Sequence, residues 1–278
     1  MRLKTFILII MLSTSSFAQS NYTDLYKLAG AELKKLNYQK AIKLLDQAIA
    51  EKADFAQAFQ LRGRAYYSLR QYQKALSDFD RAIDLDPQFV EAYLNRGSAY
   101  FNLGKFDLML TDYNRALEID PQNGEAYYRR GHGYINAFAD TAKALDDYSQ
   151  AVELDPELIY AFFNRGNIYA AQNEDQKALA DFEQAIKLQP NLTQAYFNRT
   201  TINFKLKDFE PVIVDMKAVL AEDSTSCLAH YYLGIAYINL KEYKAAITAY
   251  ESCLLCCQTQ PAIIEDAQAK LKQLAKFK

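Results

Sequence analysis

The chain has 278 residues, half of them hydrophobic, and it contains 21 tyrosines but only nine glycines and six prolines. This composition favours helices over β-sandwiches or disordered tails, and the length suits either two average domains or one elongated array. The 32 basic and 34 acidic residues nearly balance, which argues against a nucleic-acid-binding protein, since such proteins normally carry a basic excess on one face.

Residues 1–18 have the anatomy of a secretory signal peptide. Arg2 and Lys4 form a positive start, residues 6–12 are apolar, and small residues lead to a cleavage position after Ala18. An uncleaved membrane anchor is the alternative, but the apolar run is too short to span a bilayer and lacks a second positive flank. We therefore expect cleavage, export to the periplasm or out of the cell, and no integral membrane segment in the mature protein.

After this segment the sequence repeats itself with a period close to 34 residues. Four residue pairs that end in proline, beginning with Asp86-Pro87, recur at steps of 34, 35 and 34 residues, and each follows an Arg-Gly pair such as Arg62-Gly63. Apolar residues fall at helical spacing on two segments of each repeat, and the proline then forces a turn because it cannot continue a helix. The predicted repeats span residues 22–55, 56–89, 90–123, 124–158, 159–192, 193–226 and 227–260.

The repeats share aromatic, small and proline residues at fixed positions. In the second repeat, positions 4, 8, 11, 20, 24, 27 and 32 hold Phe59, Gly63, Tyr66, Ala75, Phe79, Ala82 and Pro87. This pattern resembles the tetratricopeptide-repeat (TPR) family over nearly all of the chain after residue 18. The resemblance implies an all-α fold, a right-handed superhelical solenoid of about seven helix-turn-helix hairpins. The repeat 193–226 is degenerate, with Thr200 and Asn203 at positions 8 and 11.

Residues 261–278 follow the last repeat and predict one more amphipathic helix. Ile263, Ile264 and Leu271 belong to its apolar face, while lysines such as Lys272 point away. A helix that docks on a partner is the alternative. We expect a capping helix, because the end of a solenoid needs a solvated surface.

Five repeats carry an arginine at position 7 and an aspartate at position 23, whereas the first and last repeats have apolar residues at both. The two residue types therefore occur together. An arginine can hold a carboxylate with two hydrogen bonds, so we predict structural ion pairs inside the hairpins rather than ligand-binding arginines. The predicted pairs are Arg62–Asp78, Arg96–Asp112, Arg130–Asp147, Arg165–Asp181 and Arg199–Asp215.

The resemblance also implies where a partner would bind, because the first helices of TPR hairpins line the concave side of the superhelix. Aromatic residues there offer rigid contact area, and asparagine side chains can hold the main chain of an extended peptide. The implied peptide-binding residues are Tyr67, Asn95, Phe101, Tyr128, Phe163, Asn164, Phe197, Asn198, Phe204 and Tyr231. Packing between adjacent repeats is the alternative role for several of these aromatics. Position 5 has no lysine, which argues against the family's lysine clamp for acidic C-terminal tails.

All four cysteines lie in the last repeat. Cys227 begins its first helix, and Cys253 and Cys256 lie near the end of its second helix, so an antiparallel hairpin brings these ends together. In an exported protein this arrangement predicts a disulfide from Cys227 to Cys253 or Cys256. Redox-active or metal-binding thiols are the alternative, but the C-terminus of a helix disfavours a thiolate.

The sequence contains no phosphate-binding loop, nucleophile elbow or dinucleotide-binding motif. His230 replaces a core aromatic, and His132 could face the groove but is a single residue. We therefore predict a non-catalytic scaffold that binds a protein or peptide partner, with no cofactor, no metal and no nucleic acid. The alternative function is that of a thiol-dependent redox or metal-binding protein that uses the cysteines of the last repeat.

Overall fold

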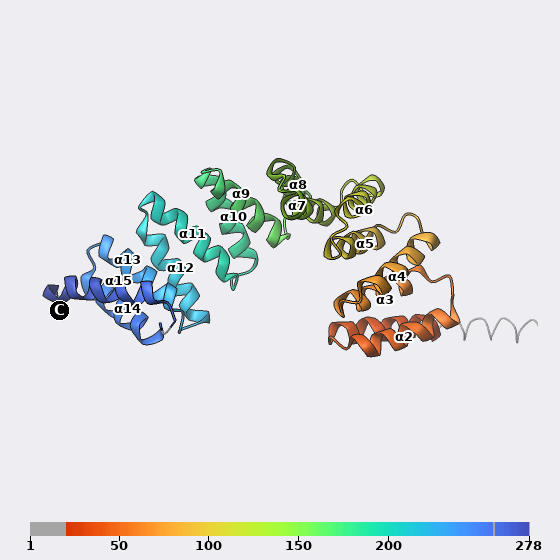
Figure 1. Ribbon diagram of the computed structural model, residues 1–278, viewed down its shortest axis with the longest axis horizontal. Coiled ribbons are helices and arrows are strands. Elements are labelled where there is room, and N and C mark those ends of the chain that lie inside the picture. The colour runs from red at the N-terminus through yellow and green to blue at the C-terminus, as the bar shows by residue number, and fades with distance from the viewer. Residues whose placement is uncertain (1–20, 258, 278) are drawn as a thin grey trace, which may run out of the picture. The chain divides into compact units, whose positions relative to one another are not determined.

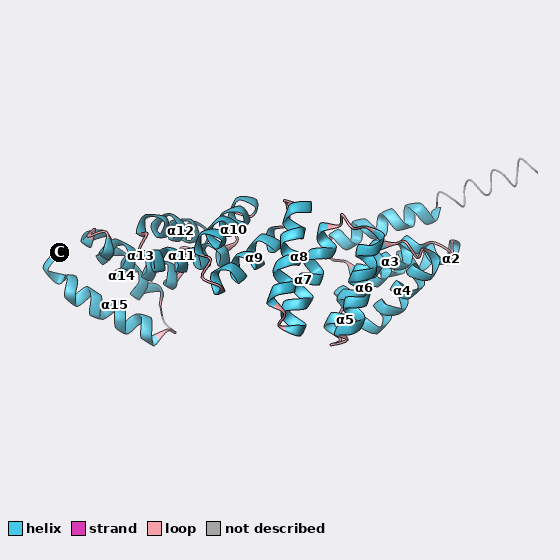
Figure 2. Cartoon of the chain, turned by 90° about the horizontal axis from the view of Figure 1, so that it is seen from above, coloured by secondary structure: helices cyan, strands magenta, loops and turns pink. Residues whose placement is uncertain are grey.

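The computed structural model describes residues 21–257 and 259–277, and the regular secondary structure of these residues is entirely helical (Figure 1, Figure 2). The chain divides into two compact parts, here called the N-terminal half (Met1–Asp155) and the C-terminal half (Pro156–Lys278). The segment 1–18, interpreted as a signal peptide, lies outside the described residues. Within them, no helix has the length and apolarity needed to cross a membrane.

In the N-terminal half, successive helices form hairpins that pack one on the next (Figure 1). A first helix covers residues 21–34. It is followed by α2 (Tyr38–Glu51), α3 (Ala56–Ser68), α4 (Tyr72–Leu85), α5 (Val90–Asn102), α6 (Phe106–Ile119), α7 (Gly124–Phe138) and α8 (Thr141–Leu154). The helices α3 and α4, α5 and α6, and α7 and α8 make the most extensive contacts, while α4 packs on α5 and α6 packs on α7.

The C-terminal half repeats the arrangement and ends with one additional helix. Its elements are α9 (Ile159–Ala171), α10 (Asp175–Leu188), α11 (Thr193–Leu206), α12 (Phe209–Glu222), α13 (Cys227–Asn239), α14 (Tyr243–Cys256), α15 (Pro261–Leu274) and the short 3₁₀ helix η1 (Ala275–Phe277). The predicted all-α repeat architecture is thus confirmed.

The two helices of each hairpin are joined by a tight turn that contains one residue with left-handed backbone. These residues are Leu36, Arg70, Gly104, Ala139, Asn173, Lys207 and Lys241. The extra residue of the repeat 124–158 falls just before such a turn, because α7 has 15 residues where α5 has 13. α7 is thus about half a turn longer than α5, while the turn that follows it is one residue shorter, and the hairpin stays intact.

Inside five of the described hairpins the helices approach so closely that a glycine is needed at the contact. A Cβ atom on Gly97 of α5 would lie 2.6 Å from Cε1 of Tyr113 on α6, whose side chain is buried. Gly63 of α3 has the same relation to Phe79 of α4, at 2.5 Å. The aromatic ring therefore lies directly on the glycine backbone, which explains the pairing of a small residue at position 8 with an aromatic at position 24.

The arginine at position 7 forms an ion pair with the aspartate at position 23 of the same hairpin. Arg96 Nε and Nη2 donate to the two carboxylate oxygens of Asp112 at 2.9 and 2.7 Å. All five predicted pairs have this two-bonded geometry. Every aspartate of the set is buried, whereas Arg96 remains about one-fifth exposed. The pair therefore links the two helices of the hairpin at the edge of its core.

The same arginine also reaches the preceding hairpin, which sequence reasoning did not anticipate. In the N-terminal half, Arg62 Nη1 donates to Asp46 of α2 at 2.6 Å, and Arg96 Nη1 donates to Asp80 of α4 at 2.7 Å. Hydrogen bonding to Asp78 raises the pKa of Arg62 above its ordinary value, so this guanidinium stays charged. Asp46 and Asp80 are half exposed, so each outer contact contributes at most about 1 kcal/mol.

The additional helix α15 packs on α14 and, to a smaller extent, on α13. It buries Ala267 and Leu274. Phe277 of η1 stacks on Tyr243 of α14, with ring centroids 4.0 Å apart. The chain thus covers the apolar face of its last hairpin with its own C-terminal residues.

We predict that Asp112→Ala lowers the free energy of unfolding by about 3–5 kcal/mol, because it leaves the Arg96 charge partly buried without its partner. The double variant Arg96→Leu with Asp112→Leu should cost clearly less, since it removes both charges. Urea unfolding followed by far-ultraviolet circular dichroism measures both. Equal losses in the single and double variants would contradict a structural ion pair.

We also predict opposite effects from two glycine substitutions. Gly97→Ala should destabilise the protein by about 1–3 kcal/mol, because the new methyl group overlaps the buried Tyr113 ring. Gly30→Ala should be neutral or stabilising by up to about 1 kcal/mol, because no neighbouring atom lies within 4 Å of the position that the new methyl group would take, and alanine favours a helix. The same unfolding measurement compares them, and a destabilised Gly30→Ala with an unaffected Gly97→Ala would refute the packing argument.

Candidate functional site

Three of the aromatic residues implied as peptide-binding line one pocket in the N-terminal half. They are Tyr67 on α3, Phe101 on α5 and Tyr128 on α7. These are the first helices of consecutive hairpins, and α5 contacts both α3 and α7. The pocket has a volume of about 200 Å³ and is also lined by Ser98, Asn102, Tyr113, Arg129 and His132. We call it the α3–α5–α7 pocket.

An imidazole completes the aromatic wall of this pocket. The His132 ring lies 5.5 Å from the ring of Phe101 and 6.4 Å from that of Tyr128, measured between centroids. Burial lowers the pKa of His132 below 6.5, so the ring is neutral at pH 7. The wall of the pocket is therefore apolar and uncharged on this side.

A chain of hydrogen bonds fixes the polar side of the pocket. Asn102 Nδ2 donates to Tyr67 Oη at 2.8 Å and to the Ser98 carbonyl at 2.9 Å. Ser98 Oγ lies 3.1 Å from Tyr113 Oη and accepts from Arg129 Nη1 at 3.2 Å. Burial raises the pKa of Tyr113 to about 12, so its hydroxyl keeps its proton. These contacts hold the side chains in place before any partner arrives.

Arg129 is the one cation among the pocket-lining residues, and its charge is largely matched. Its Nε donates to Glu125 Oε1 at 2.6 Å. Its Nη1 also lies 3.4 Å from the Leu94 carbonyl and from Asn95 Oδ1. Asn95, implied as a peptide-binding residue, is thus engaged by Arg129. With the guanidinium paired and His132 neutral, the pocket suits an uncharged group.

In the C-terminal half, two of the implied residues meet around a third aromatic. The Tyr232 ring lies 6.1 Å from Phe197 and 5.3 Å from Phe204. All three rings pack against the same buried core cluster, so they serve packing as well as surface contact. Asn198 Nδ2 donates to Asn167 Oδ1 at 2.7 Å, which links α11 to α9. The asparagines of neighbouring first helices therefore contact one another.

The other implied residues of this half are also half-buried. Phe163 packs on Phe182 at 6.0 Å between ring centroids, and Asn164 is half-buried. Tyr231 Oη donates to Asp266 Oδ2 of α15 at 2.9 Å, and burial raises its pKa to about 12. The Tyr231 hydroxyl is thus already hydrogen-bonded to the capping helix α15.

Several residues that the structure brings into these sites were not among the implied peptide-binding residues, although the sequence analysis did note that His132 could face the groove. His132 and Ser98 stand at position 9 and Asn102 at position 13, and both positions belong to the groove face of the family pattern. Tyr232 stands at position 6, which holds Asn95, Asn164 and Asn198 in other repeats. Their positions in the repeat placed these residues on the groove face. A single histidine or serine does not indicate a binding site, however, until the residues around it in the fold are known.

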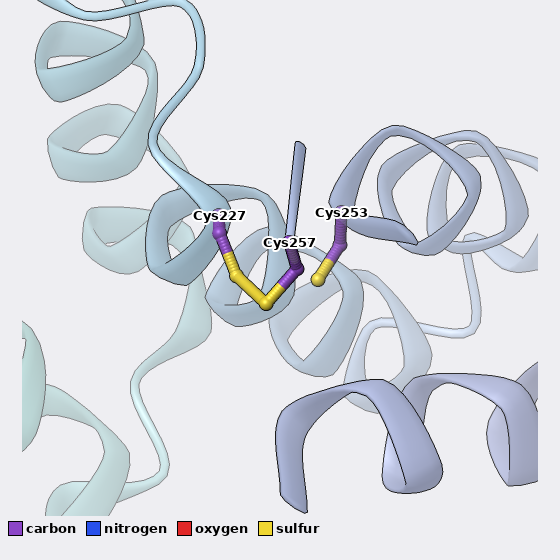
Figure 3. Close-up of side chains that lie close together, drawn as sticks. All are labelled: Cys227, Cys253 and Cys257. Carbon is purple, nitrogen blue, oxygen red and sulfur yellow. A yellow bond between two sulfur atoms is a disulfide. The ribbon is translucent and has the colours of Figure 1, made fainter. Parts of the chain in front are cut away.

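The predicted disulfide was wrong in its second partner. Cys227 is bonded to Cys257, and Cys253 beside them has a free thiol (Figure 3). Cys256 also has a free thiol. Cys257 follows the last residue of α14 and stands one helical turn beyond Cys253, so both side chains lie on the side that faces the start of α13. Cys256 lies on another side of the helix and is partly exposed.

We predict that His132 makes folding stability fall at acidic pH. Its pKa in the folded state lies below 6.5, so the unfolded chain takes up the proton first as the pH falls through 6.5. The stability is thus complete above 6.5 and decreases below it. Urea unfolding between about pH 7.5 and about pH 5 should show a smaller decrease for His132→Gln than for the wild type. Identical decreases would show that His132 does not contribute.

Comparison with known proteins places these features in a family. A family model described as TPR repeat matches residues 63–104 and 140–173. Two models described as tetratricopeptide repeat match residues 90–123 and 159–192, and residues 228–255. No curated protein matches the sequence.

Solved structures share the fold at low sequence identity. The C-terminal part of a TPR repeat-containing protein from Cytophaga hutchinsonii is 19% identical with a TM-score of 0.65, covering 86% of this chain and 98% of that chain. A tetratricopeptide repeat protein from Parabacteroides merdae is also 19% identical, with a TM-score of 0.55 and coverages of 92% and 99%. YrrB, a TPR protein with an unusual peptide-binding site, is 22% identical with a TM-score of 0.51 and coverages of 66% and 95%. With its repeated helical hairpins and the family matches along both halves, the chain belongs to the tetratricopeptide-repeat family.

Proposed function

We propose that this protein is a non-catalytic scaffold that binds a polypeptide partner, and that the α3–α5–α7 pocket holds one uncharged side chain of that partner. Membership of the TPR family supports a role in protein interaction. The observation that carries the proposal is that Tyr67, Phe101 and Tyr128, from three successive first helices, line one pocket. Aromatic residues around a pocket are typical anchors of protein interfaces.

The size of the pocket limits what can enter it. A cavity of about 150 Å³ is enough for a benzene molecule, so about 200 Å³ accommodates one large aliphatic or aromatic side chain. A whole small-molecule cofactor would normally need about 300 Å³ or more. The pocket is thus suited to a single anchor residue of a longer chain.

The polar groups of the pocket suit the main chain next to such an anchor. Asn102 and Tyr67 present an amide and a hydroxyl at the pocket edge, joined by their own hydrogen bond. Arg129 is paired with Glu125, so an acidic anchor would have to compete with that carboxylate. We therefore expect a partner with an apolar or aromatic anchor rather than an acidic one. YrrB, which shares the fold, has a peptide-binding site, and this supports a peptide as the ligand class.

We also propose that the protein is exported. The support is the signal-peptide pattern of residues 1–18 together with the Cys227–Cys257 disulfide, because disulfides persist mainly in oxidising compartments. Sequencing the N-terminus of the protein from fractionated cells tests this point. A mature chain that begins after Ala18 outside the cytoplasm is expected, and an intact Met1 in the cytoplasm would refute it.

The function is tested by capture of partners on the immobilised protein followed by binding measurements with the partner that is captured. Tyr128→Ala and Phe101→Ala should each weaken binding by about 10-fold or more, because each removes an anchor-contacting ring worth more than about 1 kcal/mol. Tyr160→Ala is the matched control, since Tyr160 is an exposed aromatic that does not line the pocket. Circular dichroism verifies that the variants fold.

Two outcomes would contradict the pocket as the binding site. One is an unchanged affinity in both pocket variants with a retained fold. The other is a loss in Tyr160→Ala as large as that in the pocket variants, which would place binding on a different surface.

A further inference from the structure

We propose that the reduced protein binds one thiophilic metal ion of the Zn²⁺ class through Cys227, Cys253 and Cys257. These three side chains lie close together in the C-terminal half (Figure 3), and their sulfur atoms are within 4.8 Å of one another. Three thiolates that bind one ion at about 2.3 Å in tetrahedral geometry are about 3.8 Å apart. Small side-chain rotations are therefore enough to convert the observed cluster into a coordination site.

The local fold explains why the sulfurs converge. Cys227 is the first residue of α13, and the N-terminus of a helix favours a thiolate. Cys253 and Cys257 are separated by one turn at the end of α14, so their side chains project from the same side. Because α13 and α14 pack closely along their length, the start of one helix lies beside the end of the other.

The sulfur ligands of this cluster determine which metal ions it would bind. The described residues of the cluster are all cysteines, with no carboxylate or histidine among them. Thiolates prefer Zn²⁺, Cu⁺ and related ions over Ca²⁺ or Mg²⁺, which take oxygen ligands. Three protein ligands leave a fourth position of a tetrahedral ion for water or a small ligand.

The surroundings favour a metal over free thiolates. Cys253 and Cys257 are buried in an apolar cluster with Ile247, Tyr250 and Leu274. A thiolate without a partner is costly in such surroundings, whereas a bound cation compensates its charge. Binding therefore takes up one divalent ion and releases three protons, one from each thiol.

The disulfide and the metal site use the same atoms and exclude each other. In the observed disulfide, Cys227 and Cys257 are bonded to each other, and a two-electron reductant such as a phosphine must break this bond, with uptake of two protons, before either sulfur can bind a metal. Metal binding should thus be confined to the reduced chain, and a bound ion should protect the thiols from oxidation. This inference is independent of the peptide pocket, which lies in the other half of the chain.

The test uses the full chain, reduced with a phosphine and then freed of excess reductant, and titrated with Cd²⁺ under anaerobic conditions. Cd²⁺ bound to thiolates absorbs in the ultraviolet, which reports sulfur coordination directly. We expect one Cd²⁺ per chain, its displacement by Zn²⁺, and no such absorption from the oxidised chain. Circular dichroism monitors the fold throughout.

Three variants locate the site. Loss of a residue that only supports a ligand costs about 10–100-fold in metal affinity, so loss of a ligand in Cys253→Ser should cost more than about 100-fold. Cys227→Ser should behave alike and is the safer variant for folding, because Cys227 is half-buried at a helix start where serine is tolerated. Cys256→Ser is the matched control and should bind like the wild type.

The proposal is overturned by any of three results with a retained fold. These are the absence of thiolate absorption in the reduced wild type, equal binding by the oxidised chain, and a loss in Cys256→Ser as large as that in Cys253→Ser.

Discussion

The close contact between the two helices of each hairpin is the interaction on which the rest of the structure depends. In five hairpins an aromatic ring on the second helix lies directly on a glycine of the first, as Tyr113 does on Gly97. In the second to sixth repeats a two-bonded arginine–aspartate pair also joins the two helices, as Arg96 and Asp112 do. Packing fixes the distance between the helices, and the ion pair fixes their register, because a guanidinium binds both carboxylate oxygens in only one orientation.

The α3–α5–α7 pocket follows from how one hairpin packs on the next. The first helices α3, α5 and α7 lie in succession, so residues about 34 positions apart in sequence come within contact distance. Arg62 and Arg96 add to the packing of successive hairpins, because each donates a hydrogen bond to an aspartate of the preceding hairpin. The pocket itself then combines rings that the repeat places on a shared face with a hydrogen-bonded group centred on Ser98 and Asn102. A rigid frame of this kind lowers the entropy lost when a partner binds.

The last hairpin departs from the others, and its chemistry differs accordingly. Like the first hairpin, it lacks the arginine–aspartate pair, with Leu233 and Ala249 at the two positions. A disulfide between the start of α13 and the end of α14 links the two helices instead. The capping helix α15 then covers the hairpin and takes up the Tyr231 hydroxyl. Covalent linkage and capping are two ways of stabilising the end of a repeat array, where one neighbouring hairpin is missing.

The sequence by itself determined the helical hairpins, their order and the partners of the arginines, because these depend on residue type at a regular spacing within one repeat. Tertiary structure decided the rest. Whether His132 belongs to a site depended on Phe101 and Tyr128, which come from α5 and from its own helix α7. The choice of Cys257 over Cys253 depended on where α14 ends, and the second contact of Arg62 depended on the preceding hairpin. Such contacts join different helices at distances of a few ångströms, and spacing along the chain does not specify positions to that precision.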